Sequence, residues 1–221
     1  MLRNTVQKGR RGFSNLLLLS LSLLLSACGT PGLEELERLC KEEAGELIGE
    51  PIEVEGFFHA SEDDCGGCMT MMTASAYQYI EWYNTKINRS MGDLDLNQHY
   101  RMYKAEKDNA LCNWRIINSK DDSDYNFCIV TEAVNVADLL SKYSYSLFFN
   151  RKKLSKNVLL SNAYEEIKDM RAGEIVAYRN NYSLYPQKNS AFDPGKSISC
   201  STDSNRFSKV SMPRGVLQGG K

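Results

Sequence analysis

Two cysteines separated by two glycines, Cys65-Gly66-Gly67-Cys68, are the side chains best suited to chemistry in this sequence of 221 residues. Two thiols at this spacing can close a local disulfide, or they can exchange electrons with another dithiol when a cation or helix N-terminus lowers a thiol pKa. The preceding Ser61-Glu62-Asp63-Asp64 is acidic, which opposes that activation, and we see no βαβ pattern around the pair. We therefore predict structural disulfides, with thiol–disulfide exchange as the alternative.

The same segment contains residue types that bind metals. Cysteine, histidine and carboxylate sets bind zinc, whereas thioethers and thiolates suit copper(I). A closed tetrathiolate site would need a second close cysteine pair, and no such pair is present. The simpler interpretation is that the cysteines form disulfides and that the acidic residues lie in a loop exposed to water. We therefore predict no metal and no cofactor. The possible ligands are His59, Asp63, Asp64, Cys65 and Cys68, followed by Met69, Met71 and Met72.

Patterns for nucleophilic catalysis and for phosphate binding are absent from the sequence. Its many Asp and Glu residues leave a dicarboxylate hydrolase open, but such residues usually form a solvated face. Its two histidines are His59 and His99, and there is no Gly-x-Ser-x-Gly nucleophile motif. It also has no glycine-rich loop for a phosphate or dinucleotide. We therefore expect a protein that is not an enzyme.

Five tyrosines cluster in the middle of the chain. Tyrosines on strands can form a flat platform for a ligand, or they can lie at the edge of a core with the hydroxyl reaching water. We give more weight to the second interpretation. The residues are Tyr77, Tyr79, Tyr83, Tyr100 and Tyr103.

The N-terminus has the pattern of a bacterial lipoprotein leader. Four basic residues precede an apolar segment, Leu16 to Leu25, which is too short to span a bilayer as a permanent helix. Leu25-Ser26-Ala27-Cys28 resembles the lipobox, which implies cleavage between Ala27 and Cys28 and acylation of Cys28 with fatty acids such as palmitate. Two or three acyl chains make a stable membrane anchor. Gly29, in a place where Asp would signal retention in the inner membrane, favours the outer membrane.

Lipidation of Cys28 leaves an even set of cysteines. Six cysteines in an oxidising compartment predict up to three disulfides among fifteen possible pairings. We favour Cys112–Cys128 across a hairpin, Cys40–Cys200 between the ends of the domain, and Cys65–Cys68 as a local bridge.

Charge argues against polyanionic partners. Of the 27 basic residues four leave with the leader, while all 28 acidic residues remain, so the mature chain has a net charge of −5. A chain of this charge without a long basic run is a poor candidate for binding nucleic acid or an anionic lipid surface. Its expected contact with the membrane is therefore the lipid on Cys28.

Periodicity predicts the elements that position these residues. Residues 33–48 have the apolar spacing of an amphipathic helix, and seven to nine short strands follow. Asp169 to Gly173 is typical of a hairpin turn, with Glu174 to Arg179 as the return strand and a loop from Tyr182 onward. We predict an α+β fold with the N-terminal helix packed on an antiparallel sheet as one disulfide-stapled domain. The expected divisions are a leader (1–27), a lipidated tether (28–32), the domain (33–203) and a disordered tail (204–221).

The arrangement as a whole resembles small, uncharacterised bacterial lipoproteins. The likeness lies in the cysteine-bearing opening helix, the Val-Glu-Gly-Phe-Phe and Tyr-Gln-Tyr-Ile-Glu segments, and the turn at Arg171-Ala172-Gly173-Glu174. This resemblance implies an envelope lipoprotein, facing the periplasm or the cell surface, but it implies no activity. We expect a non-catalytic protein that binds an envelope protein or component. The alternative is a periplasmic thiol–disulfide or metal-binding protein that uses residues 65–68.

Overall fold

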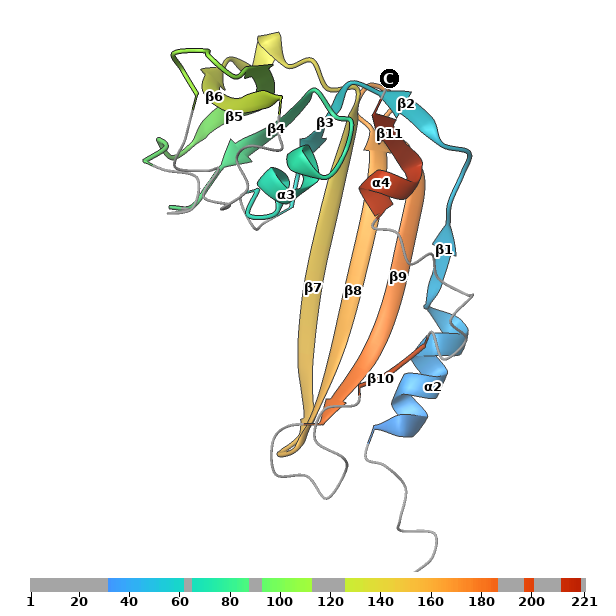
Figure 1. Ribbon diagram of the computed structural model, residues 1–221. Coiled ribbons are helices and arrows are strands. Elements are labelled where there is room, and N and C mark those ends of the chain that lie inside the picture. The colour runs from blue at the N-terminus through green and yellow to red at the C-terminus, as the bar shows by residue number, and fades with distance from the viewer. Residues whose placement is uncertain are drawn as a thin grey trace, which may run out of the picture.

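The fold is built around a large mixed sheet (Figure 1). A computed structural model describes residues 32–61, 65–87, 93–112, 126–186, 197–200 and 212–219. Within these residues the sheet has nine strands in the order β1-β9-β8-β7-β3-β4-β5-β6, and β10 also pairs with β9. β2 and β11 form a separate parallel pair. The shorter strands are β1 (Gly45–Leu47), β2 (Ile52–Val54), β3 (Gly56–His59), β4 (Tyr79–Asn84), β5 (Gln98–Glu106), β6 (Phe127–Val134), β10 (Ile198–Ser199) and β11 (Leu217–Gly219).

Three long strands form an extended arm. β7 (Tyr143–Ser155), β8 (Val158–Asp169) and β9 (Ile175–Pro186) pair antiparallel along almost their whole length. A strand of about twelve residues at about 3.3 Å per residue spans about 40 Å. Gly173 in the β8–β9 turn has a φ of 73°, which glycine adopts without steric cost. The predicted turn at Asp169 to Gly173 is confirmed.

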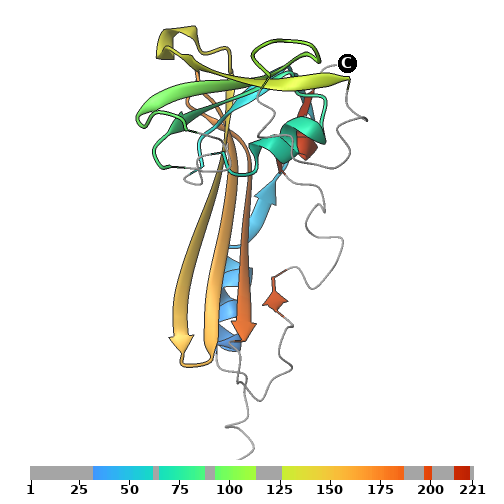
Figure 2. The same cartoon turned by 60° about the vertical axis from the view of Figure 1, so that its left-hand side comes forward.

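β3 to β6 form a head at one end of the arm (Figures 1 and 2). β3 pairs parallel with both β4 and β7, while β5 is antiparallel to β4 and β6. The chain passes from β3 to β4 through α3 (Cys68–Thr73), so these three elements form a βαβ unit. The main core lies between the head and the upper arm. Its buried side chains include Phe57, Tyr77, Trp82, Met102, Tyr145 and Ile167.

α2 (Leu33–Glu42) lies along the arm at the end opposite the head, which we call the foot (Figure 1). Leu36 and Leu39 pack there against Val158, Leu160 and Leu184 of the arm. The disulfide between Cys40 and Cys200 joins α2 to the end of the chain segment that contains β10.

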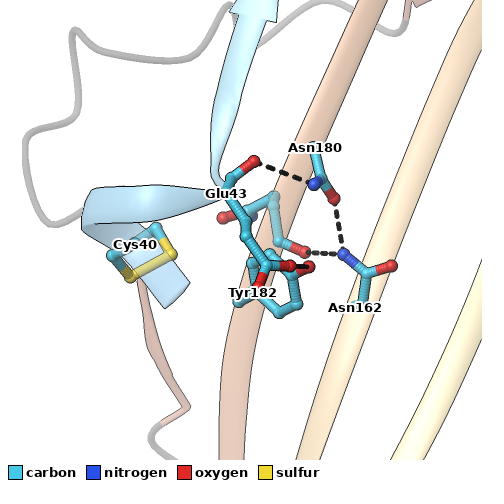
Figure 3. The surroundings of a disulfide bond; sticks show 7 residues. Cys40, Glu43, Asn162, Asn180 and Tyr182 are labelled. Carbon is cyan, nitrogen blue, oxygen red and sulfur yellow. Dashed lines mark hydrogen bonds between the residues drawn. A yellow bond between two sulfur atoms is a disulfide. The ribbon is translucent and has the colours of Figure 1, made fainter. Parts of the chain in front are cut away.

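Hydrogen bonds beside this disulfide join the end of α2 to the arm (Figure 3). The hydroxyl of Tyr182 donates to the carboxylate of Glu43 over 2.6 Å, and Asn180 Nδ2 donates to the Glu43 carbonyl oxygen over 2.9 Å. Burial, and then the hydrogen bond to Glu43, raises the pKa of Tyr182. These contacts fix α2 to β9 independently of the disulfide.

The predicted fold class is wrong. The described part of the chain is mostly β, with 52% strand and only 15% helix, and its large sheet is mixed rather than antiparallel. α2 buries only two side chains and forms no helical layer over the sheet. The predicted helix also ends earlier than expected, at Glu42, because Gly45 to Leu47 pair with β9 as β1. This pairing outweighs the helical spacing of the apolar residues.

The predicted disordered tail is wrong for residues 212–219. α4 (Met212–Val216) leads into β11, and Val216 and Leu217 are buried in the main core. The Tyr77 hydroxyl donates to the carbonyl oxygens of Pro213 (2.7 Å) and Leu217 (2.5 Å). β11 pairs with β2, far away in sequence, so no local pattern could reveal it. β9 likewise continues to Pro186, beyond the point where we expected a loop.

Candidate functional site

The six predicted cysteines form three disulfides, in the pairing that the sequence favours. These are Cys40–Cys200, Cys65–Cys68 and Cys112–Cys128. The first joins α2 to Cys200, which directly follows β10. The third joins Cys112, in the segment after β5, to Cys128, the second residue of β6. Ala27 and Cys28, the predicted cleavage and lipidation residues, lie outside the described residues.

The Cys65–Cys68 pair lies within the βαβ unit, between the end of β3 and the first residue of α3. The Cys68 N–H donates to the Cys65 carbonyl oxygen over 3.0 Å, which closes a tight turn, and Cys65 has a φ of 62°. Both side chains are fully buried. Our expectation that no βαβ unit surrounds this pair is therefore wrong. The six-residue α3 is too short for its periodicity to stand out in the sequence.

His59 is brought next to this disulfide. It is the last residue of β3, its side chain is only 3% exposed, and its ring lies 5.8 Å from that of Tyr145. One imidazole nitrogen and the sulfur atoms of Cys65 and Cys68 all lie within 4.8 Å of one another. Three metal-ligand types from a single short segment thus converge inside the core.

A cavity of about 510 Å³ adjoins His59 at the carboxyl ends of the parallel strands β3 and β4. This is where ligands commonly bind in sheets with parallel strands. The lining side chains are Phe58, His59, Ala60, Ser61, Tyr83, Thr85 and Lys86. His99, the other histidine, lies 4.7 Å from Tyr83 in ring-centre distance and does not take part in the cysteine cluster.

The other possible ligands do not join this cluster within the described residues. Asp63 and Asp64 lie outside the described residues. Met72 is fully buried in the main core, and Met69 and Met71 are partly buried against it. The methionines therefore pack as apolar side chains.

The five tyrosines do not form a ligand platform. Tyr77, Tyr79 and Tyr100 are buried, and Tyr103 is half-buried, so only Tyr83 is exposed. Tyr100 stacks on Trp82 with ring centres 5.6 Å apart. The structure therefore favours the core interpretation of these residues.

Three other aromatic side chains form a row across the arm. They lie on the same face of the sheet as α2, which covers that face closer to the foot. The rings of Phe148 (β7) and Tyr164 (β8) stack with centres 6.3 Å apart, and Tyr164 stacks on Tyr178 (β9) at 6.4 Å. Burial, and then the hydrogen bond from its hydroxyl to Glu166, raises the pKa of Tyr164. The sequence analysis missed this row. The row could have been predicted from the two turns that connect β7, β8 and β9, because these turns set the register of the three strands and so decide which residues lie side by side.

Among the residues that the structure describes, one edge of β7 has no strand partner over much of its length. In the described chain β7 pairs with β3 only at Ser144 and Tyr145. The Leu147 N–H then donates to Ser61 Oγ over 2.7 Å. Because backbone groups alternate in direction along a strand, those of Phe149, Arg151 and Lys153 face away from β8, like those of Tyr145 and Leu147.

Apolar side chains flank this open edge on both faces. Phe148 is 40% exposed on one face and Phe149 is 64% exposed on the other. The next residues of β7 toward the foot are basic, and Arg151, Lys152 and Lys153 are all exposed. Charged residues of this kind protect sheet edges from pairing, but they protect only the lower part of β7.

A buried ion pair holds the other half of the head together. Glu81 on β4 is fully buried, and Arg101 Nη2 on β5 lies 2.7 Å from its Oε1. The Glu81 carboxylate also accepts the N–H groups of Leu140 (3.1 Å) and Ser141 (2.9 Å) and the Ser141 hydroxyl (2.5 Å). The buried carboxylate thus ties β4 to β5 and to the segment before β7, so we interpret it as structural.

Comparison with protein-family models, with curated proteins and with solved structures finds no match to this chain. Among the described residues no helix is long and apolar enough to cross a membrane. The apolar segment from Leu16 to Leu25 lies outside those residues.

Proposed function

We propose that this protein is a lipid-anchored lipoprotein of the bacterial envelope that binds, without catalysis, an extended segment of another envelope protein. The segment would add to the sheet as a strand along the open edge of β7. The main support is that this edge has outward-facing backbone groups beside exposed Phe148 and Phe149. Edges of this kind bind extended chains through main-chain hydrogen bonds, and flanking side chains supply specificity.

The side chains beside the edge define the chemistry of the partner segment. Next to Phe148 and Phe149 it would be apolar, because both rings are exposed to water and can be covered by a neighbouring side chain. Next to Arg151 and Lys153 it would be acidic, because a like charge there would repel and an opposite charge would steer association. The proposed ligand is therefore an extended segment with apolar residues at one end and acidic residues at the other.

The position of the tether suits this function. The described chain begins at Gly32, next to α2 at the foot, where a side chain at Gly32 would contact Leu154. Gly32 follows Cys28 by four positions, a distance of at most about 14 Å along an extended chain. An acyl anchor on Cys28 would hold the foot near the membrane, with Phe149 about 20 Å and the head about 40 Å away along β7. Gly29 supports placing the anchor in the outer membrane.

A photo-crosslinking experiment tests the binding edge. Benzoylphenylalanine replaces Phe149 in the full-length chain in growing cells, and Tyr185 on β9, which is also exposed, serves as the matched control position. We expect a crosslinked partner from position 149 and none from position 185. The residue in the partner that captures the crosslink identifies the bound segment, which should be extended, apolar and followed by acidic residues.

A proline substitution separates edge pairing from simple hydrophobic contact. Phe149→Pro removes an N–H that faces away from β8, so the β7–β8 ladder remains while a pairing strand loses a hydrogen bond. Phe149→Ala removes the ring and keeps the N–H. With benzoylphenylalanine at position 148, we expect Phe149→Pro to reduce the yield of crosslinked partner more than Phe149→Ala does. Equal yields from both variants, or from positions 149 and 185, would contradict the proposal.

The anchor has its own test. An alkyne-tagged fatty acid fed to cells should label the wild-type chain, and Cys28→Ser should remove the label. Labelling that persists in Cys28→Ser would place the lipid elsewhere and remove this part of the proposal.

A further inference from the structure

We propose that the protein, when its Cys65–Cys68 disulfide is reduced, binds one Zn²⁺ through His59, Cys65 and Cys68. The inference is independent of the strand-binding function, since the site lies inside the core and the β7 edge lies on the surface. It rests on the convergence of the three side chains and on the cavity that His59 lines.

The geometry of the cluster is close to that of a zinc site. With Zn–S bonds of about 2.3 Å and a Zn–N bond of about 2.0 Å, tetrahedral ligand atoms lie about 3.5–3.8 Å apart. The nitrogen and two sulfur atoms here lie within 4.8 Å of one another. Shifts of about an ångström after the sulfur–sulfur bond opens would complete the arrangement. His59 also lines the cavity. A water molecule that enters from there would supply the fourth ligand, as in zinc sites with three protein ligands.

Charge selects Zn²⁺ over copper(I) at this position. Two thiolates and a neutral imidazole around Zn²⁺ have a net charge of zero, whereas the same ligands around Cu⁺ have a net charge of −1. All three side chains are buried, and an uncompensated charge in the interior is expensive. The neutral zinc complex is therefore the more stable occupant.

Reduction and metal binding are two balanced steps. A dithiol reductant attacks the disulfide through one thiolate, forms a mixed disulfide and releases one cysteine thiolate. Its second thiol then displaces the other cysteine, so the protein gains two electrons and two protons and the reductant becomes a disulfide. Zn²⁺ then replaces the two thiol protons, which are released to solvent. The loop at residues 65–68 thus alternates between a disulfide and a zinc site.

Zinc retention and thiol protection test the proposal on the full mature chain. The protein is reduced anaerobically with a phosphine, transferred to phosphine-free buffer and mixed with one equivalent of Zn²⁺. We expect one zinc to remain per chain after desalting. Alkylation followed by peptide mass spectrometry should show protection of Cys65 and Cys68, and no protection of the other four cysteines. The oxidised protein should retain no zinc.

Two histidine variants supply the matched comparison. His59→Ala removes a direct zinc ligand. It should weaken zinc binding by at least about 100-fold, the upper end of the loss caused by removing residues that only support a metal ligand. His99→Ala should bind zinc like the wild type. If His59→Ala does not fold, the protection map of the wild type still decides. No retained zinc, protection spread over all six cysteines, or equal affinity in the two variants would overturn the proposal.

Discussion

Replacing Glu81 with alanine tests whether the buried ion pair stabilises the head. Glu81 is fully buried, while Arg101 is 14% exposed and contacts its carboxylate from the neighbouring strand. The same carboxylate accepts hydrogen bonds from residues 140 and 141, which lie between β6 and β7. Glu81→Ala would therefore remove the buried carboxylate that faces the Arg101 guanidinium, which keeps the more exposed Glu132 and the Asp138 carbonyl oxygen. It would also leave two backbone N–H groups without this acceptor.

The expected loss is large compared with the stability of a typical domain. Breaking a buried ion pair by removing one partner costs about 3–5 kcal/mol. With a urea dependence of about 2 kcal/mol per molar, a loss of about 4 kcal/mol lowers the unfolding midpoint by about 2 M. Glu81→Gln retains an oxygen acceptor but no charge, so it should lose about 2 kcal/mol, the typical value of one hydrogen bond to a charged group.

Urea unfolding followed by tryptophan fluorescence measures these losses, because Trp82 lies on the same strand as Glu81. The matched control is Glu132→Ala, which removes the other carboxylate near Arg101. Glu132 is 44% exposed and lies 3.4 Å from Nη1, so its loss should cost less than about 1 kcal/mol. Equal midpoints for Glu81→Ala and Glu132→Ala would refute the reasoning that burial makes the first pair important.

Three further changes test other parts of the fold. Gly56→Ala should destabilise by about 1–3 kcal/mol in urea, because its methyl group would overlap a backbone carbonyl on β4, whereas Gly45→Ala, with open space around it, should not. Replacing Cys40 and Cys200 together by serine should cost about 2–5 kcal/mol by calorimetry, because that disulfide closes a loop with a sequence separation of 160. Hydrogen bonds from the backbone N–H groups of Ala172 and Arg171 lower the pKa of Asp169 below its ordinary value of 3.8. The ionised Asp169 carboxylate therefore stabilises the folded state fully above pH 3.8, and this stabilisation should be lost as the pH falls through the lowered pKa. Asp169→Asn should remove this part of the acid dependence in pH-titrated urea unfolding, and an unchanged slope would contradict it.

Local patterns predicted the parts of the fold that neighbouring residues decide. The hairpin at Asp169 to Gly173 followed from a glycine able to adopt a positive φ and an aspartate able to accept backbone N–H groups. The beginning of α2 at Leu33 followed from its apolar spacing. Each of these depends on a few consecutive residues, which is why the sequence alone sufficed.

Pairings between distant segments could not be predicted in this way. The prediction of an antiparallel sheet failed at β3, which pairs parallel with β4 and β7. The prediction of a disordered tail failed at β11, whose partner β2 lies 165 residues earlier in the chain (Leu217 pairs with Ile52). Alternation of side chains shows that a segment is a strand, but it does not show which strand lies beside it or in which direction.

The same distinction between local sequence and tertiary structure applies to the candidate sites. The sequence alone determined the lipobox-like segment at Cys28, the even set of six cysteines and the close spacing of Cys65 and Cys68, because these are properties of residue type and separation. Only the tertiary structure placed His59 against that disulfide and aligned Phe148, Tyr164 and Tyr178 across the arm. Within the described residues it also left β7 without a strand partner on this edge beyond Tyr145, because β3 ends at His59. These features arise from strand order and register, which are decided by the packing of the whole chain.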